Sequence, residues 1–270
     1  MVKGTLGVIV CPILEDELIY SLSNDPEEKN IFLLECKNSK DISRKLTNKK
    51  IPFTMMDERM FMNGMETLPE NAFNIVLMMK DLGLHSEPEI LKADLRETLM
   101  FMQSKVDGFA LYYGLCGNAN KDLDTWAAEH LDKPIAIFRD ENGRMCDDCI
   151  GVAVGGFDKY YSLQKKYTGI LYYTPAMATK WRDFFGQNDL FKGVESKNYD
   201  KLKLILDMCD YHKVMIIPTG LGDEKEFKES LEDFANEFKF DIMHLEPGWV
   251  TLGPTNRIYS EAKAYLTGQG

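Results

Sequence analysis

Short apolar segments alternate with longer amphipathic ones along the whole chain, and this alternation constrains the fold more than any other feature. Most short segments are near-continuous apolar runs, a pattern typical of parallel strands covered on both faces. The predicted strands cover residues 6–10, 31–35, 75–79, 108–113, 135–138, 170–173, 214–217 and 241–245. The predicted helices cover residues 14–23, 87–104, 123–130, 157–166, 177–185, 201–209, 224–238 and 256–265. This repetition predicts an α/β fold with one or more doubly wound, mostly parallel sheets.

No low-complexity tract or flexible linker divides the chain into domains. We therefore interpret residues 1–270 as a single α/β unit. A finer division into two Rossmann-like lobes around a cleft, about 1–165 and 166–270, stays open because a second set of strand–helix units begins near residue 165.

The charge balance limits the partners that the chain can bind. Acidic side chains outnumber basic ones by 43 to 32, which gives a formal net charge of −11. Nucleic acids and anionic membranes attract clustered Lys and Arg, and no such stripe is present. No secretory signal opens the chain, and no apolar run approaches the ~20 residues that span a bilayer. We expect a cytoplasmic protein that binds a small molecule, with neither nucleic acid nor membrane as a partner.

Three of the six cysteines lie at what we interpret as the carboxyl ends of buried strands, namely Cys11, Cys116 and Cys149. In α/β folds these ends meet at one rim, where ligands bind, so three thiols could converge on one metal ion or cluster. A helix N-terminus beside Cys11, and another beside Cys149, would lower the thiol pKa and favour the thiolate. Taken singly, each cysteine is better explained by core packing or turn geometry.

Neighbouring residues extend this candidate site. Cys146 and Cys149 form a C-x-x-C pair, which occurs in zinc sites and redox pairs, although no second pair is present. Cys146 is therefore a candidate fourth ligand. The residues expected to contact a cofactor adjoin these cysteines or follow a strand, where glycines permit close backbone approach and an acid can cap a helix. They are Gly114, Gly117, Asn118, Asp148, Gly151 and Thr174.

The histidines and the common catalytic and nucleotide-binding motifs give less information about function than the cysteines do. The four histidines lack metal-ligand spacing relative to one another. His244 reaches the rim with Glu246 and could donate a proton or act as a fourth ligand, but an ordinary strand histidine is the favoured interpretation. Neither G-x-G-x-x-G after the first strand, nor a P-loop, nor G-x-S-x-G is present, so the usual dinucleotide, NTP and hydrolase sites are unsupported.

The segments 114–118 and 148–150 resemble the archaeal and bacterial family called domain of unknown function 1638, and the resemblance spans nearly the whole chain. The matching positions are Cys11, Gly114, Cys116, Gly117, Asp148 and Cys149. The chain departs from the family pattern at 138–146, where it has an insertion-like stretch, and at 174–177, where Thr-Pro-Gly-Trp is expected. Members often occur beside genes for corrinoid-dependent methyltransferases in methylotrophic methanogens and acetogens. The resemblance thus implies a corrinoid protein or methyltransferase as a partner.

Three hypotheses about function follow. The first is a metalloprotein whose Cys11, Cys116 and Cys149 hold an iron–sulfur cluster or another metal, in corrinoid-linked one-carbon metabolism. Quinolinate synthase, which places one cysteine from each of three α/β units on a cluster, is an analogy at the level of fold. Zinc, suited to activating a thiol for methyl transfer, is the near alternative. The second is a non-enzymatic accessory or corrinoid-binding protein, although the corrinoid D-x-H-x-x-G signature is missing. The third is a set of structural thiols that never meet.

Overall fold

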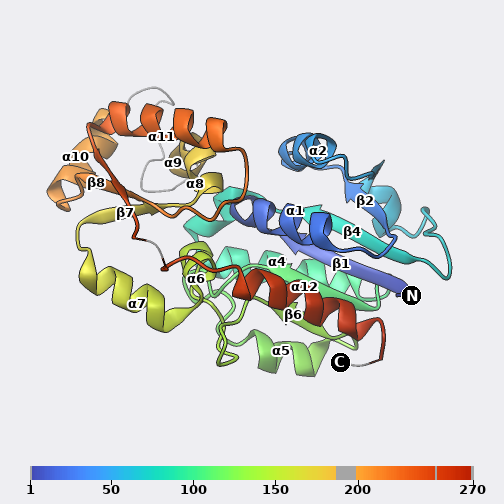
Figure 1. The fold of residues 1–270 in the computed structure, drawn as a ribbon. Coiled ribbons are helices and arrows are strands. Elements are labelled where there is room, and N and C mark those ends of the chain that lie inside the picture. The colour runs from blue at the N-terminus through green and yellow to red at the C-terminus, as the bar shows by residue number, and fades with distance from the viewer. Residues whose placement is uncertain (1, 187–198, 247, 269–270) are drawn as a thin grey trace.

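Two parallel sheets organise the computed structural model, which describes residues 2–186, 199–246 and 248–268 (Figure 1). The larger sheet has six strands in the order β3-β2-β4-β1-β5-β6, and the smaller has three in the order β7-β8-β9. Every strand pair in both sheets is parallel. The prediction of a doubly wound α/β fold is confirmed. The lobe boundary near residue 165 stays a prediction, although the smaller sheet begins at Ile170.

The elements of the larger sheet come first along the chain. Its strands are β1 (Gly4–Val10), β2 (Asn30–Leu34), β3 (Thr54–Met56), β4 (Phe73–Met79), β5 (Gly108–Tyr112) and β6 (Ile135–Ile137). Its helices are η1 (Pro12–Leu14), α1 (Glu15–Asn24), α2 (Ser39–Asn48), α3 (Glu58–Met62), η2 (Leu82–Ser86), α4 (Pro88–Met102), α5 (Leu123–His130) and α6 (Cys149–Val154).

The remaining elements build the smaller sheet and then return to the larger one. The strands are β7 (Ile170–Tyr173), β8 (Lys213–Ile216) and β9 (Asp241–His244). The helices are α7 (Phe157–Lys166), α8 (Pro175–Thr179), α9 (Trp181–Gly186), α10 (Asp200–Met208), α11 (Glu224–Phe238) and α12 (Gly253–Tyr265). Among the described residues, no helix combines the length and the apolar character needed to cross a membrane.

Strand β1 lies at the centre of the larger sheet, and its position decides where a ligand can bind. It pairs with β4 on one side and β5 on the other, and its residues after Gly4 are all buried. The chain passes from β1 toward β2 on one side and from β4 toward β5 on the other. Right-handed crossovers in opposite directions separate the two following loops and open a crevice at the carboxyl ends of β1 and β4.

The structure differs from the sequence prediction in several elements, including the short helices η2 and α3, which were not predicted. Strand β3 and helix α2 were not predicted, because β3 has only three residues and α2 carries only Ile42 and Leu46 as buried apolar residues. The single helix expected over 177–185 is instead two short helices, α8 and α9, separated at Lys180. Lys180 is buried and forms ion pairs with residues of the larger sheet's helices, so tertiary contacts override the continuous helical pattern.

Two segments connect the sheets, one before β7 and one after β9. The first contains Gly155 and Gly156, both with positive φ, between α6 and α7. The second leads into α12, which packs against α1, β5 and β6 (Figure 1). The backbone N–H of Thr251 donates to the carbonyl of Ala153 at 3.0 Å, so the two connections lie side by side.

Candidate functional site

A cavity of about 590 Å³ lies between the carboxyl-end rim of the larger sheet and the edge strand β7 of the smaller one. Its volume falls within the usual range for small-molecule sites, about 300–1,000 Å³. Cys11, Cys116 and Cys149 all line it, so the structure brings the three sequence-predicted thiols to one space. The rest of the rim wall comes from the loops after β1, β4 and β5 and from the start of α6.

Cys11 directly follows β1 and is held at the rim by its backbone. Its N–H donates to the carbonyl of Tyr112 on β5 at 3.3 Å. Its Sγ lies 3.3 Å from Nε2 of His85. Burial raises the pKa of this thiol to about 12 and outweighs the nearby N–H groups of η1, so the expected lowering of its pKa is wrong.

Cys116 is positioned by an unusual stretch of backbone after β5. Cys116, Gly117 and Asn118 all have positive φ, at 47°, 66° and 72°. The N–H of Cys116 donates to the carbonyl of Asp147 at 2.8 Å. A β-carbon at Gly114 would stand 2.6 Å from the carbonyl oxygen of Cys146, so only glycine permits this close approach.

Cys149 is the first residue of α6 rather than the end of a strand, which corrects the sequence interpretation. Asp148 caps this helix, because its Oδ1 accepts from the N–H groups of Ile150 and Gly151 at 2.8 and 2.9 Å. The Sγ of Cys149 lies 3.7 Å from Sδ of Met177. Burial, assisted by the Asp148 carboxylate, raises the pKa of this thiol, so the predicted lowering is wrong here too.

The three thiols also share one electrostatic environment. Burial and then the charge of Cys11 raise the pKa of Cys116 well above its ordinary value. Cys11 and Cys116 both contribute to the raised pKa of Cys149. Removing a proton from one thiol therefore makes the others harder to ionise, as expected of neighbouring groups in a common cavity.

Four other sequence-predicted residues do not line the cavity. Cys146 is fully buried, and its carbonyl accepts from the N–H of Leu115 at 2.9 Å. Asn118 is exposed, and Gly151 lies buried within α6. Thr174 caps α8, where its Oγ1 accepts from the N–H of Met177 at 3.4 Å.

Two further points concern metal binding. His244 is an exposed residue of β9 and does not line the cavity. Across residues 2–186, 199–246 and 248–268, no group of three or more His, Cys, Asp or Glu side chains is arranged to hold a metal ion.

His85 is the rim residue that the sequence did not reveal. It lies in η2, after β4, and its ring stacks on Tyr113 with centroids 5.7 Å apart. Burial lowers the pKa of His85 to about 4. The Tyr113 hydroxyl is fully buried and has no hydrogen-bond partner among the described residues. Knowledge of the strand order would have revealed His85. Because β4 lies beside β1 in the sheet, the loop that follows β4 must lie beside Cys11.

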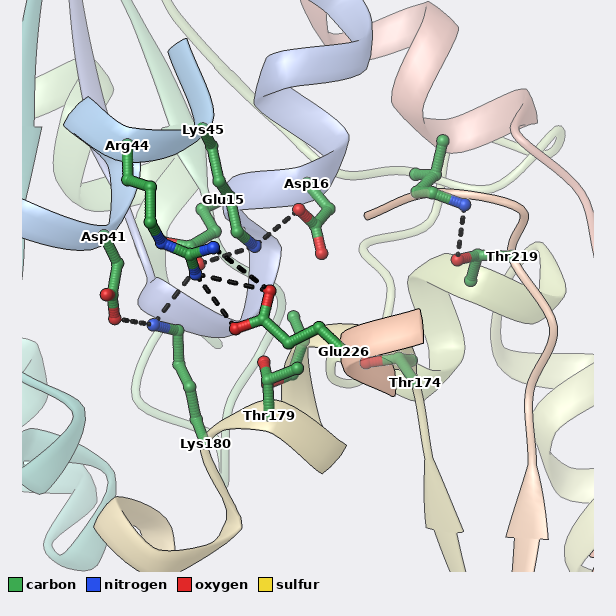
Figure 2. A network of polar contacts seen from close by, with 12 residues as sticks. Glu15, Asp16, Asp41, Arg44, Lys45, Thr174, Thr179, Lys180, Thr219 and Glu226 are labelled. Atoms are coloured by element: carbon green, nitrogen blue, oxygen red, sulfur yellow. Dashed lines mark hydrogen bonds and ion pairs between the residues drawn. The ribbon is translucent and has the colours of Figure 1, made fainter. Parts of the chain in front are cut away.

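A buried ionic network stands near the start of α1 (Figure 2). The Nζ of Lys45 lies 2.7 Å from Oε1 of Glu15 and 2.6 Å from Oδ1 of Asp16. Lys180, which follows α8, reaches Glu15 at 3.3 Å and Asp41 at 2.6 Å (Figure 2). The network thus joins helices of the larger sheet to the segment after β7.

Glu17 on α1 is another buried acid. Burial and the neighbouring Asp16 raise its pKa to about 8. Its Oε2 has no hydrogen-bond partner among the described residues.

Comparisons with known proteins identify a family but no activity. No curated protein matches the chain. The solved structures include an N-acetyl-L-ornithine transcarbamylase mutant complexed with PALAO, at 9% identity and a TM-score of 0.19, covering 94% of this chain and 78% of the other. A TM-score this low carries no argument. The family model for proteins of unknown function, DUF1638, matches residues 79–254, a range that contains Cys116, Cys146 and Cys149 and excludes Cys11. The chain belongs to the DUF1638 family.

Proposed function

We propose that Cys11, Cys116 and Cys149 bind an iron–sulfur cluster that acts on a small molecule held in the same cavity. The observation that carries the proposal is the placement of three thiols, from two loops and the start of α6, on the wall of one cavity of about 590 Å³. A single ion needs little of that space, whereas a cluster and a small ligand together suit it. In line with the family resemblance, we place this activity in corrinoid-linked one-carbon metabolism, with a corrinoid protein or methyltransferase as partner.

The donor types around the thiols suit soft-metal chemistry, although among the described residues these side chains are not arranged around an ion and would have to move to ligate a cluster. Thiolates are the usual ligands of iron–sulfur clusters, and imidazole is a common fourth donor when a cysteine is replaced. His85 stands beside Cys11, and its lowered pKa keeps a nitrogen lone pair available. Because burial raises the thiol pKa values, loading the cluster must release protons from the site. Cys11, Cys116 and Cys149 would be the three protein ligands of such a cluster, which would supply Lewis-acid chemistry to a bound molecule.

Anaerobic purification with metal and sulfide analysis tests the proposal. We expect a brown protein with about four iron and four sulfide per chain. Cys11→Ser, Cys116→Ser and Cys149→Ser should each lose most of the iron. Cys36→Ser and Cys209→Ser are matched controls that should keep it, because neither residue lines the cavity.

Other results would redirect or overturn this assignment. A colourless protein with one zinc, lost in the same three variants, would replace the cluster by zinc-dependent methyl transfer. A metal-free protein that binds added hydroxocobalamin, followed by its visible spectrum, would favour the accessory or corrinoid-binding role. A protein that binds none of these would leave the thiols structural.

A further inference from the structure

The cavity has a second wall that is aromatic. This wall is formed by α7, by the segment 167–172, by Phe184 of α9 and by Tyr211, which lies just before β8. The aromatic lining residues on this side are Tyr160, Tyr167, Tyr172, Phe184 and Tyr211. Among the described lining residues there is neither Lys nor Arg, and Asp148 is the one carboxylate. An anionic ligand would therefore meet no opposite charge on this wall.

Two of these tyrosines are fixed in orientation by their hydroxyl groups. The Tyr160 hydroxyl donates to Oδ2 of Asp148 at 3.1 Å. The Tyr172 hydroxyl donates to the carbonyl of Tyr167 at 2.9 Å. The two rings stand at 82° with centroids 6.4 Å apart, so they form two sides of a corner. Both hydroxyl groups are hydrogen-bonded to the protein, so a ligand would contact mainly the rings of Tyr160 and Tyr172.

One lysine near the cavity, Lys166, already contacts one of these aromatic rings. The Nζ of Lys166 lies 5.1 Å from the centroid of the Tyr167 ring and forms an ion pair with Glu246 at 2.7 Å. Lys166 does not line the cavity and is neutralised by its own partner. Apart from the three thiols and His85, the electrostatic features of the cavity are therefore its aromatic rings and the Asp148 carboxylate.

We propose that this aromatic wall binds a small methylated ammonium cation. Aromatic faces attract a cation whose charge is spread over methyl groups, and the attraction grows when the site is shielded from water. The Asp148 carboxylate lines the same cavity and supplies the opposite charge. Its Oδ1 accepts from the N-terminus of α6 and its Oδ2 from Tyr160, and because burial raises its pKa, a bound cation would favour its charged form. The inference rests on the proposed function only in naming the ligand class of the same cavity, since the wall is built without the thiols.

Calorimetry with choline and its neutral isostere 3,3-dimethyl-1-butanol tests the charge preference directly. We expect choline to bind at least about tenfold more tightly, because shape is shared and only the charge differs. Tyr172→Leu should weaken choline binding by about tenfold. Tyr161→Leu is the matched control and should bind as the parent does, because Tyr161 is exposed on α7 and lies outside the cavity.

The same titrations on the Cys149→Ser variant separate this inference from the proposed function. Choline binding that survives there, with the cluster lost, supports the aromatic site on its own evidence. Equal affinity for the two isosteres, or no binding of either to protein whose circular dichroism matches the parent, would overturn the cation assignment. In that case an intact iron–sulfur spectrum would still leave the cluster standing.

Discussion

Cys116 shows how backbone conformation rather than side-chain packing sets the position of a rim thiol. Three consecutive residues from Cys116 to Asn118 have positive φ, a conformation that costs non-glycine residues about 1–3 kcal/mol each. The surrounding hydrogen bonds to the 146–147 backbone hold this arrangement in place. Such strain is typical of functional sites, and here it turns the cysteine toward the cavity.

Gly114→Ala tests how tightly the two loops must approach. The new β-carbon would overlap the carbonyl of Cys146, and backbone cannot move aside cheaply, so we expect the free energy of unfolding to fall by about 1–3 kcal/mol. Gly151→Ala is the control: it is helical, its nearest neighbour would be 3.7 Å away, and it should be neutral or stabilising by up to about 1 kcal/mol. Urea denaturation measures both, and equal effects would contradict the close-approach argument.

For single residues, the sequence predicted where the rim cysteines lie better than it predicted their pKa values. It brought Cys11, Cys116 and Cys149 to one space because parallel strands end together, although Cys149 lies at the start of helix α6 and not at a strand end. It missed the raised thiol pKa values because burial depends on the second wall, which comes from distant residues such as Met177. It missed His85 because the strand order, which sets β4 beside β1, is not written in local periodicity.

Among the elements, α6 is short and depends on its cap. It has only six residues, so few of its N–H groups are bonded within the helix. Asp148 satisfies two of them and also accepts from Tyr160, thereby joining α6 to α7. The cap was predictable from sequence because an acid stands at the start of an apolar run, whereas its partner on α7 was not.

Asp148→Ala and Asp148→Asn separate the cap from the charge. Alanine removes the acceptor, and we expect a loss of about 1–2 kcal/mol in the free energy of unfolding. Asparagine keeps a capping oxygen and should cost less than about 0.5 kcal/mol. Thermal and urea unfolding give the comparison, and a loss with asparagine as large as that with alanine would show that the carboxylate charge, not the cap, holds α6.

For the whole molecule, the parallel α/β architecture was predictable because continuous apolar runs predict buried strands. The way the two sheets are held together was not predictable, because it depends on ion pairs between residues far apart in sequence. Lys180 joins Glu15 and Asp41 in a buried setting, and Arg44 joins Glu226 on the exposed side of the same junction (Figure 2).

Lys180→Ala and Arg44→Ala compare these two links. Glu15 is 1% exposed and would keep only Lys45, so Lys180→Ala should lower the free energy of unfolding by about 1–3 kcal/mol. The Arg44–Glu226 pair is exposed at 47% and 36%, so Arg44→Ala should cost below about 1 kcal/mol. Urea denaturation of both variants distinguishes them, and a larger effect at Arg44 would reverse our assignment of the main link.

The paired connections between the sheets have a mechanical consequence. Because the Thr251 N–H is bonded to the Ala153 carbonyl, the two crossings act as one hinge rather than as separate tethers. The thiol loops lie on one side of that hinge, whereas Tyr160 and Tyr172 lie on the other. A rotation about residues 153 and 251 would therefore leave every strand pair of both sheets intact, but it would have to break the Tyr160–Asp148 hydrogen bond and the Lys180 ion pairs before the cavity could widen.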